Sequence, residues 1–162
     1  MNVWCGFLGN NLIGPFVFDN NLTGNTYEVF LRNELPGLLE NVPLMIRSQK
    51  YFQHDGAPPH YTRRMIKYLN ESFPNRWLGR GGPVAWPPRS PNLTPLDYYI
   101  WGNMKTVYKT KVNSKAELRH RIFGAAEHIR NHHDNIVSAT QFLLMLAEKC
   151  IATRGGHFEQ LL

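Results

Sequence analysis

The first segment that could carry chemistry is residues 53–60, QHDGAPPH, where Asp55 follows a short predicted strand and precedes a helix whose first turn contains proline. Ligands bind at the carboxyl ends of strands in α/β folds, so Asp55 is a candidate catalytic or metal-binding residue. Two alternatives stay open. Asp55 could instead cap the turn or the helix, or His54, Asp55 and His60 could ligate zinc, although no fourth ligand is at hand.

The second segment is residues 86–101, WPPRSPNLTPLDYYIW, in which Asp97 lies at the start of a predicted helix. A capping role is consistent with this position, with Thr94 as the N-cap, Pro95 at the first helical position and Asp97 at the third. A carboxylate at a helix start can also hold a metal ion. A third alternative makes residues 87–91 a polyproline ligand for a partner domain, but an aromatic helix follows at once, which favours a loop that is folded in.

Apolar runs and periodicities predict the elements that position these segments. Strands are predicted at 3–8, 13–18 and 51–54, and the first two are joined by a turn. Apolar residues three and four positions apart predict helices at about 26–39, 60–73, 97–109, 115–130 and 135–152. Ser114 and Glu117 predict a capping box at the start of the fourth helix, and the Gly- and Pro-rich stretch 79–95 predicts an irregular loop with a functional role. Together these elements indicate a mixed α/β or α+β domain.

Composition limits the classes of protein to consider. The 162 residues are 43% hydrophobic, enough for one domain with a sizeable core. The net charge of +6 favours a polyanionic partner such as nucleic acid. No apolar run is long enough to span a bilayer and no signal peptide is evident, so we expect a soluble, intracellular protein without a membrane partner. Cys5 and Cys150 lie in apolar surroundings and are expected to be buried thiols.

The two segments together resemble the mariner-type branch of the DNA transposases with an acidic catalytic triad. The resemblance rests on a strand ending in Gln-x-Asp-Gly-Ala-Pro-Pro-His, followed by a Trp-Pro-x-x-Ser-Pro-x-Leu-x-Pro-x-Asp run before an aromatic helix. It extends through residues 3–6, 13–16, 22–24 and 155–159, and so covers nearly all of the chain. Asn92 stands where many relatives have Asp. That position is outside the triad, so we expect little chemical effect.

This resemblance implies a ribonuclease H-like mixed sheet flanked by helices, present here as a single partial catalytic domain over residues 1–162. It places Asp55 as the second catalytic carboxylate and Asp97 as the third, both ligands of Mg²⁺ or Mn²⁺. The first Asp of the family lies on a strand preceding the one that residues 3–8 resemble, and Asp19 cannot replace it. We therefore expect a domain without its first strand, with either unpaired edges or direct contact between strands 3–8 and 51–54.

The resemblance further implies a nuclear protein, or one of nucleus and cytoplasm, that binds DNA and can form a homo-oligomer. Its family cuts and joins DNA by metal-dependent phosphodiester hydrolysis and strand transfer, and with two of three acids the chain is expected to be catalytically incomplete. The alternatives are an enzyme completed by another segment, a non-catalytic DNA-binding remnant, and a degraded product without a role. The candidate DNA-binding residues are Arg63, Arg64, Lys67, Arg89, Lys105 and Lys109. The resemblance implies two metal ions about 3.5 to 4 Å apart between the carboxylates of Asp55 and Asp97. These carboxylates are therefore expected within roughly 4 to 9 Å of each other.

Overall fold

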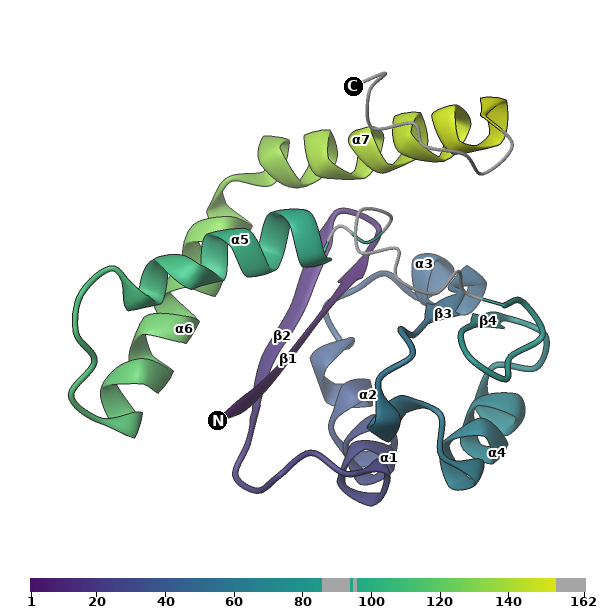
Figure 1. Ribbon diagram of the computed structural model, residues 1–162, viewed down its shortest axis with the longest axis horizontal. Coiled ribbons are helices and arrows are strands. Elements are labelled where there is room, and N and C mark those ends of the chain that lie inside the picture. The colour runs from purple at the N-terminus through teal and green to yellow at the C-terminus, as the bar shows by residue number, and fades with distance from the viewer. Residues whose placement is uncertain (86–93, 95, 154–162) are drawn as a thin grey trace. The chain divides into compact units, whose positions relative to one another are not determined.

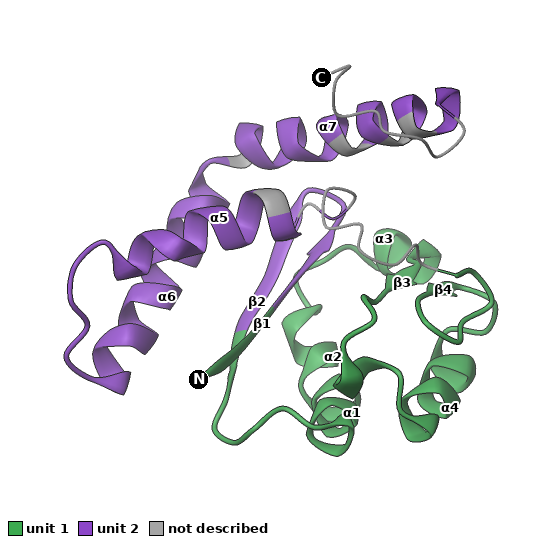
Figure 2. Cartoon of the chain, viewed as in Figure 1, with its two compact units in different colours: residues 1–4, 16–89 green, residues 5–15, 90–162 purple. Residues whose placement is uncertain are grey.

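The computed structural model describes residues 1–85, 94 and 96–153 (Figure 1). The chain divides into two compact units, shown in different colours in Figure 2. Unit 1 contains Met1–Trp4 and Phe16–Arg89, and unit 2 contains Cys5–Pro15 and Ser90–Leu162. The division bears on the site, because it assigns the two candidate carboxylates to different units.

A β-hairpin opens the chain, as the sequence predicted. Strands β1 (Asn2–Leu8) and β2 (Asn11–Phe18) pair in a two-stranded sheet, and Gly9 takes a positive φ of 58° in the turn between them. β2 is mostly buried, as its apolar sequence requires. The predicted burial of Cys5 is confirmed, and burial raises the pKa of its thiol to about 12 against the opposing charge of Arg130.

The first predicted helix is split into two. Helix α1 (Gly24–Asn33) begins at a capping box formed by Thr23 and Thr26, and α2 (Leu35–Leu38) follows after Glu34. Pro36 has no backbone N–H to continue the hydrogen bonds of α1, and its ring would crowd the preceding turn. A single helix over 26–39 is therefore wrong, although both pieces lie within or next to that range. A further short helix that was not predicted, α3 (Leu44–Gln49), follows them.

The centre of unit 1 is a parallel strand pair joined through a helix. β3 (Phe52–Gln53) pairs with β4 (Trp77–Leu78), with Phe52 opposite Trp77 and Gln53 opposite Leu78. Between them lie a short 3-10 helix, η1 (Pro58–His60), and α4 (Arg63–Ser72), where one helix over 60–73 was predicted. α4 buries Met65, Tyr68 and Leu69 on one face, which is the apolar stripe that the sequence indicated.

Trp77 anchors this unit. Its side chain is fully buried, and its indole N–H donates a hydrogen bond to Asn70 Oδ1 at 2.9 Å. The glycine-rich turn after β4 packs on the same ring, since a Cβ built at Gly82 would lie 2.8 Å from an indole carbon. The beginning of the predicted loop is thus ordered: Gly79 N–H donates to the Val84 carbonyl at 3.1 Å. Residues 86–93 and 95 lie outside the described residues.

Unit 2 is mostly helical. A π-helical turn, η3 (Leu96–Ile100), continues into α5 (Trp101–Met104) and a 3-10 turn, η4 (Lys105–Tyr108), so the helix predicted at 97–109 is present with changing geometry. α6 (Lys115–Asn131) and α7 (His133–Ala152) match the last two predictions. The Ser114 hydroxyl caps Glu117 N–H as expected, but the Glu117 carboxylate accepts from Asn113 N–H rather than from that of Ser114.

The fold class is confirmed as a mixture of helices and strands, but the sheet differs from the prediction. The described strands form two separate two-stranded sheets, β1–β2 and β3–β4, rather than one mixed sheet flanked by helices. β1 and β3 do not pair, which leaves each with one neighbouring strand among the described residues. In the part of the chain that the structure describes, no helix is long and apolar enough to cross a membrane.

Candidate functional site

Asp55 lies two residues after the end of β3, and its side chain is 65% exposed. Its Oδ1 atom accepts hydrogen bonds from Ala57 N–H at 3.0 Å and from His60 Nδ1 at 2.5 Å. The first of these bonds confirms the turn role that the sequence allowed. Both of these hydrogen bonds end on Oδ1. Structural and ligand-binding roles are thus compatible in one side chain.

The surroundings of Asp55 favour its ionised form. The hydrogen bond from His60 lowers the pKa of Asp55 to about 2, with further lowering from the Ala57 N–H and from the charges of His60 and His54, while partial burial opposes these effects. Asp55 is therefore a carboxylate throughout the neutral range. This is the state that a hard cation requires of a ligand.

A stack of aromatic rings supports the turn that holds Asp55. His54 is buried, and its Nε2 atom is 3.0 Å from the hydroxyl oxygen of Tyr27. The rings of His54 and His60 stack with centroids 4.7 Å apart, and the Tyr27 ring lies 4.7 Å from that of His60. This packing fixes His60, which in turn holds Asp55.

Burial and then the neighbouring charge of His60 lower the pKa of His54 to about 3, so its ring is neutral. Nδ1 of His54 is buried without a hydrogen-bond partner of normal geometry among the described residues. The nearby main chain of His60 raises the pKa of His54, but burial lowers it by more. The other ring nitrogen is engaged by Tyr27. Within the described residues no three His, Cys, Asp or Glu side chains are arranged to hold a metal ion, so the zinc alternative has no support.

The second candidate, Asp97, lies in the first turn of η3 and is exposed. Its N–H donates to the Thr94 carbonyl at 2.9 Å, which agrees with the predicted start of a helix at this point. Most of the motif before it, including Arg89, lies outside the described residues. Asp55 belongs to unit 1 and Asp97 to unit 2, so their convergence on a shared site stays a prediction.

Three of the candidate DNA-binding residues share the exposed side of α4, and we call Arg63, Arg64 and Lys67 the α4 basic face. Arg64 forms an ion pair with Glu28, and Lys67 lies 3.9 Å from Glu71. Part of the positive charge on this face is therefore compensated within the protein. In unit 2, Lys105 and Lys109 are exposed at η4 and directly after it.

Glu28 is a feature that the sequence did not reveal. Its side chain is only 5% exposed, and it pairs with Arg32 on its own helix as well as with Arg64 on α4. Burial opposes ionisation, but the hydrogen bonds and charges of the two arginines outweigh it and lower the pKa of Glu28. The spacing of four residues between Glu28 and Arg32 could have indicated the local pair, whereas nothing in the sequence points to Arg64.

Comparison with protein-family models and with curated protein sequences gives no match. Solved structures do match. The crystal structure of the Mos1 mariner paired end complex with Mn superposes with a TM-score of 0.68 at 21% identity, over 91% of this chain and 40% of that chain. The Mos1 transposase catalytic domain with raltegravir and Mn gives a TM-score of 0.66 at 18% identity, over 96% of this chain and 82% of the other.

The chain has the fold of a mariner transposase catalytic domain. The crystal structure of the Mos1 mariner catalytic domain agrees, with a TM-score of 0.61 at 19% identity over 91% of this chain and 68% of that one. The resemblance to mariner transposases that the sequence motifs indicated is thereby confirmed for the fold. The chain spans less than half of the Mos1 chain in the paired end complex, but most of the mariner catalytic domain.

Proposed function

We propose that this chain is derived from a mariner-type transposase. It binds DNA through exposed basic residues and divalent metal ions through its acidic positions. The observation that carries the proposal is Asp55, an exposed and ionised carboxylate at the carboxyl end of β3, within a chain that has the mariner catalytic fold. The sequence motifs around Asp55 and Asp97 support the same proposal.

The residues present suit Mg²⁺ or Mn²⁺. Such ions take carboxylate oxygens and keep several waters, so one or two carboxylates are an adequate protein contribution. Mos1 catalytic domain structures contain Mn or Mg, which supports the same choice here. When bound, a pair of such ions would activate the attacking oxygen and stabilise the leaving oxygen of a phosphodiester. Asp55 would contribute a carboxylate oxygen, and the hydrogen bonds from His60 and Ala57 N–H to Oδ1 would orient the carboxylate.

We further propose that these 162 residues do not cleave DNA by themselves, since the resemblance provides two of the three acids within them. A third carboxylate from another segment would complete the enzyme. The alternative, a DNA-binding protein without catalysis, is favoured by the exposed cations on α4 and η4. Nuclear localisation and homo-oligomer formation are part of the same proposal and rest on the family resemblance alone.

Metal binding provides the direct test. Mn²⁺ titration of the purified chain, followed by electron paramagnetic resonance, should show binding that weakens about tenfold or more in Asp55→Asn and in Asp97→Asn. In the Asp55→Asn variant the amide oxygen can still accept the Ala57 N–H, so the turn is preserved. Asp19→Asn is the matched control, because Asp19 is exposed and outside both motifs. Equal Mn²⁺ affinity in the unmodified chain and all three variants would remove the proposed metal site.

Cleavage and DNA binding are tested on the same proteins. The chain should not nick supercoiled DNA with Mg²⁺ or Mn²⁺, and nicking that is lost in Asp55→Asn would show that the site is already complete. DNA affinity should fall steeply with rising salt, because contacts to phosphates release counterions. Binding that is insensitive to salt would exclude the proposed electrostatic mode.

A further inference from the structure

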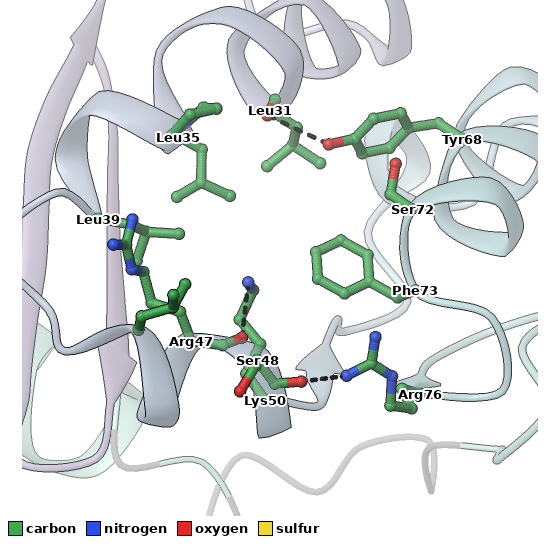
Figure 3. Close-up of a pocket in the computed structure, with 12 residues that line it drawn as sticks. Leu31, Leu35, Leu39, Arg47, Ser48, Lys50, Tyr68, Ser72, Phe73 and Arg76 are labelled. Atoms are coloured by element: carbon green, nitrogen blue, oxygen red, sulfur yellow. Dashed lines mark hydrogen bonds between the residues drawn. The ribbon is translucent and has the colours of Figure 1, made fainter.

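A pocket in unit 1 plays no part in the proposed metal site. It has a volume of about 370 Å³ and is lined by residues from α1, α2, α3 and α4 (Figure 3). One wall is formed by Leu31, Leu35 and Leu39, and the opposite wall by Tyr68 and Phe73. A pocket of this size and lining can bury one large apolar side chain.

Three cations surround this apolar interior, and we call Arg47, Lys50 and Arg76 the pocket cations. The Lys50 ammonium group points into the pocket in Figure 3, where it donates to the Arg47 carbonyl at 3.0 Å and lies 5.4 Å from the centroid of the Phe73 ring. Arg76 donates to the Ser48 carbonyl. All twelve lining residues are among those the structure describes, and none of them is acidic.

The positive charge in the pocket is therefore not compensated by its lining. Burial, together with the charges of Arg76 and Arg47, lowers the pKa of Lys50. Nε of Arg47 is buried without a hydrogen-bond partner in the described part of the chain. A buried donor without an acceptor costs stability, and an incoming carboxylate would remove that cost.

The rim of the pocket is apolar and exposed. Leu44, which lines the pocket, is 71% exposed, and Met45 beside it on α3 is 74% exposed. Exposed large apolar side chains next to a pocket are typical of protein interaction sites. A nucleic acid strand would leave this apolar surface uncovered and would gain little from a cation that points into a pocket of leucines.

We propose that the pocket and α3 form a docking site for a protein segment that inserts a large apolar side chain and places a carboxylate beside it. The apolar side chain contacts the leucine wall and Phe73. Its neighbouring Asp or Glu accepts hydrogen bonds from Arg47 and Lys50, and a second apolar residue covers Leu44 and Met45.

The probe is a library of random twelve-residue peptides displayed on phage and selected against the full chain. Selected peptides should combine Leu, Phe or Met with nearby Asp or Glu. A synthetic copy of one of them should bind in a fluorescence anisotropy titration. Binding should weaken at least about tenfold when its acidic residues are changed to Lys or its apolar residues to Ser, as expected for a lost charged hydrogen bond or a lost buried side chain.

Variants of the chain complete the test. Arg47→Gln combined with Lys50→Gln should weaken peptide binding about tenfold or more, because both donors to the carboxylate are neutralised. Lys115→Gln removes an exposed charge from α6 and should leave binding within about twofold. Circular dichroism verifies that each variant is folded, and Leu35→Met tests the wall without changing charge.

Three results would overturn the proposal. They are a selection without acidic and apolar enrichment, peptide binding that is unchanged in the double variant, and displacement of the peptide by duplex DNA as effectively as by unlabelled peptide. The last result would make the pocket a nucleic acid surface. None of these measurements involves metal binding at Asp55, so this proposal and the proposed function can fail separately.

Discussion

The α4 basic face and the pocket cations are two groups of three cations in the same unit, but their surroundings differ. On α4, Arg64 pairs with the buried Glu28, and Lys67 lies near Glu71. The pocket cations have no acidic residue among the described lining, and burial together with the charges of Arg76 and Arg47 lowers the pKa of Lys50. Counting charges in the sequence would treat the two groups alike.

The difference shows that a basic residue indicates an anionic partner only where the fold leaves its charge uncompensated. Glu28 compensates part of the positive charge of the α4 basic face within the protein. Arg64 therefore contributes to stability as well as to surface charge. In the pocket the same kind of side chain repels its neighbours. The compensated group is therefore expected to respond to mutation mainly through stability, and the uncompensated group mainly through binding.

Removing Glu28, the acid on α1 that pairs with the α4 basic face, should have the largest effect. Glu28→Gln keeps the shape but loses the charge that Arg32 and Arg64 share, so the free energy of unfolding should fall by about 1 to 3 kcal/mol. Urea denaturation measures it. Glu40→Gln, an exposed acid of the same unit, is the control and should change stability by less than about 0.5 kcal/mol. Equal losses in both variants would contradict the internal role of Glu28.

Low pH should abolish the difference in the free energy of unfolding between wild type and Glu28→Gln. Because the folded protein lowers the pKa of Glu28 below its ordinary value of 4.5, its stabilising contribution is fully present above pH 4.5 and is lost as pH falls through the folded value. The stability difference between wild type and Glu28→Gln should therefore shrink below pH 4.5. His54, neutral when folded, destabilises both proteins as pH falls below 6.5, so its effect cancels in the difference. A difference that persists undiminished at about pH 3 would argue for packing rather than charge.

DNA binding should separate residues within the α4 basic face. Arg63 has no ion pair among the described residues, whereas Arg64 is paired with Glu28. Arg63→Gln should lower the affinity for a DNA duplex at low salt by about two- to tenfold. The slope of the logarithm of affinity against the logarithm of salt concentration should also become shallower, by the amount that corresponds to about one lost phosphate contact. Arg64→Gln should have a smaller effect on affinity. The reverse order in a filter-binding or anisotropy titration would show that the ion pair opens on DNA.

The smallest effect is expected at Lys50. Its pKa is lowered from 10.5 in the folded protein, so the unfolded chain binds more protons between the folded value and pH 10.5, and this contribution to stability rises with pH there. Lys50→Met should remove that rise and change stability at about pH 7 by no more than about 0.5 kcal/mol. Lys115→Met is the matched control. A large loss of stability near neutral pH would mean that Lys50 has a compensating partner.

Much of the fold followed from local patterns in the sequence. The amphipathic stripes of α4, α6 and α7 are periodic over several turns, and the hairpin is marked by its glycine turn, so these elements were predicted within a few residues. α3 was missed because its apolar residues are exposed and form no buried stripe. β4 was missed because it is only two residues long, and its strand character comes from pairing with β3.

The candidate site shows the same limit. Asp55 and its partner His60 are five residues apart in one motif, so the sequence could bring them together. Tyr27, which supports the pair through His54, lies on α1 and is 27 positions away from His54 in sequence. Pairing across such distances depends on how α1 packs on η1 and α4, and a single sequence contains no signal for it.

The contact between Gly82 and the indole of Trp77 has a consequence for how this sequence can diverge. The string of glycines after β4 has the composition of a flexible linker, but a side chain at position 82 would collide with a ring that cannot move, since Trp77 is fully buried and tied to Asn70. The two positions are therefore expected to change together: among relatives, residue 82 should gain a Cβ only where residue 77 is smaller. Because Trp77 lies opposite Phe52 in the strand pair that precedes Asp55, a change of volume at either position is also expected to act on the strand that leads into the acidic turn.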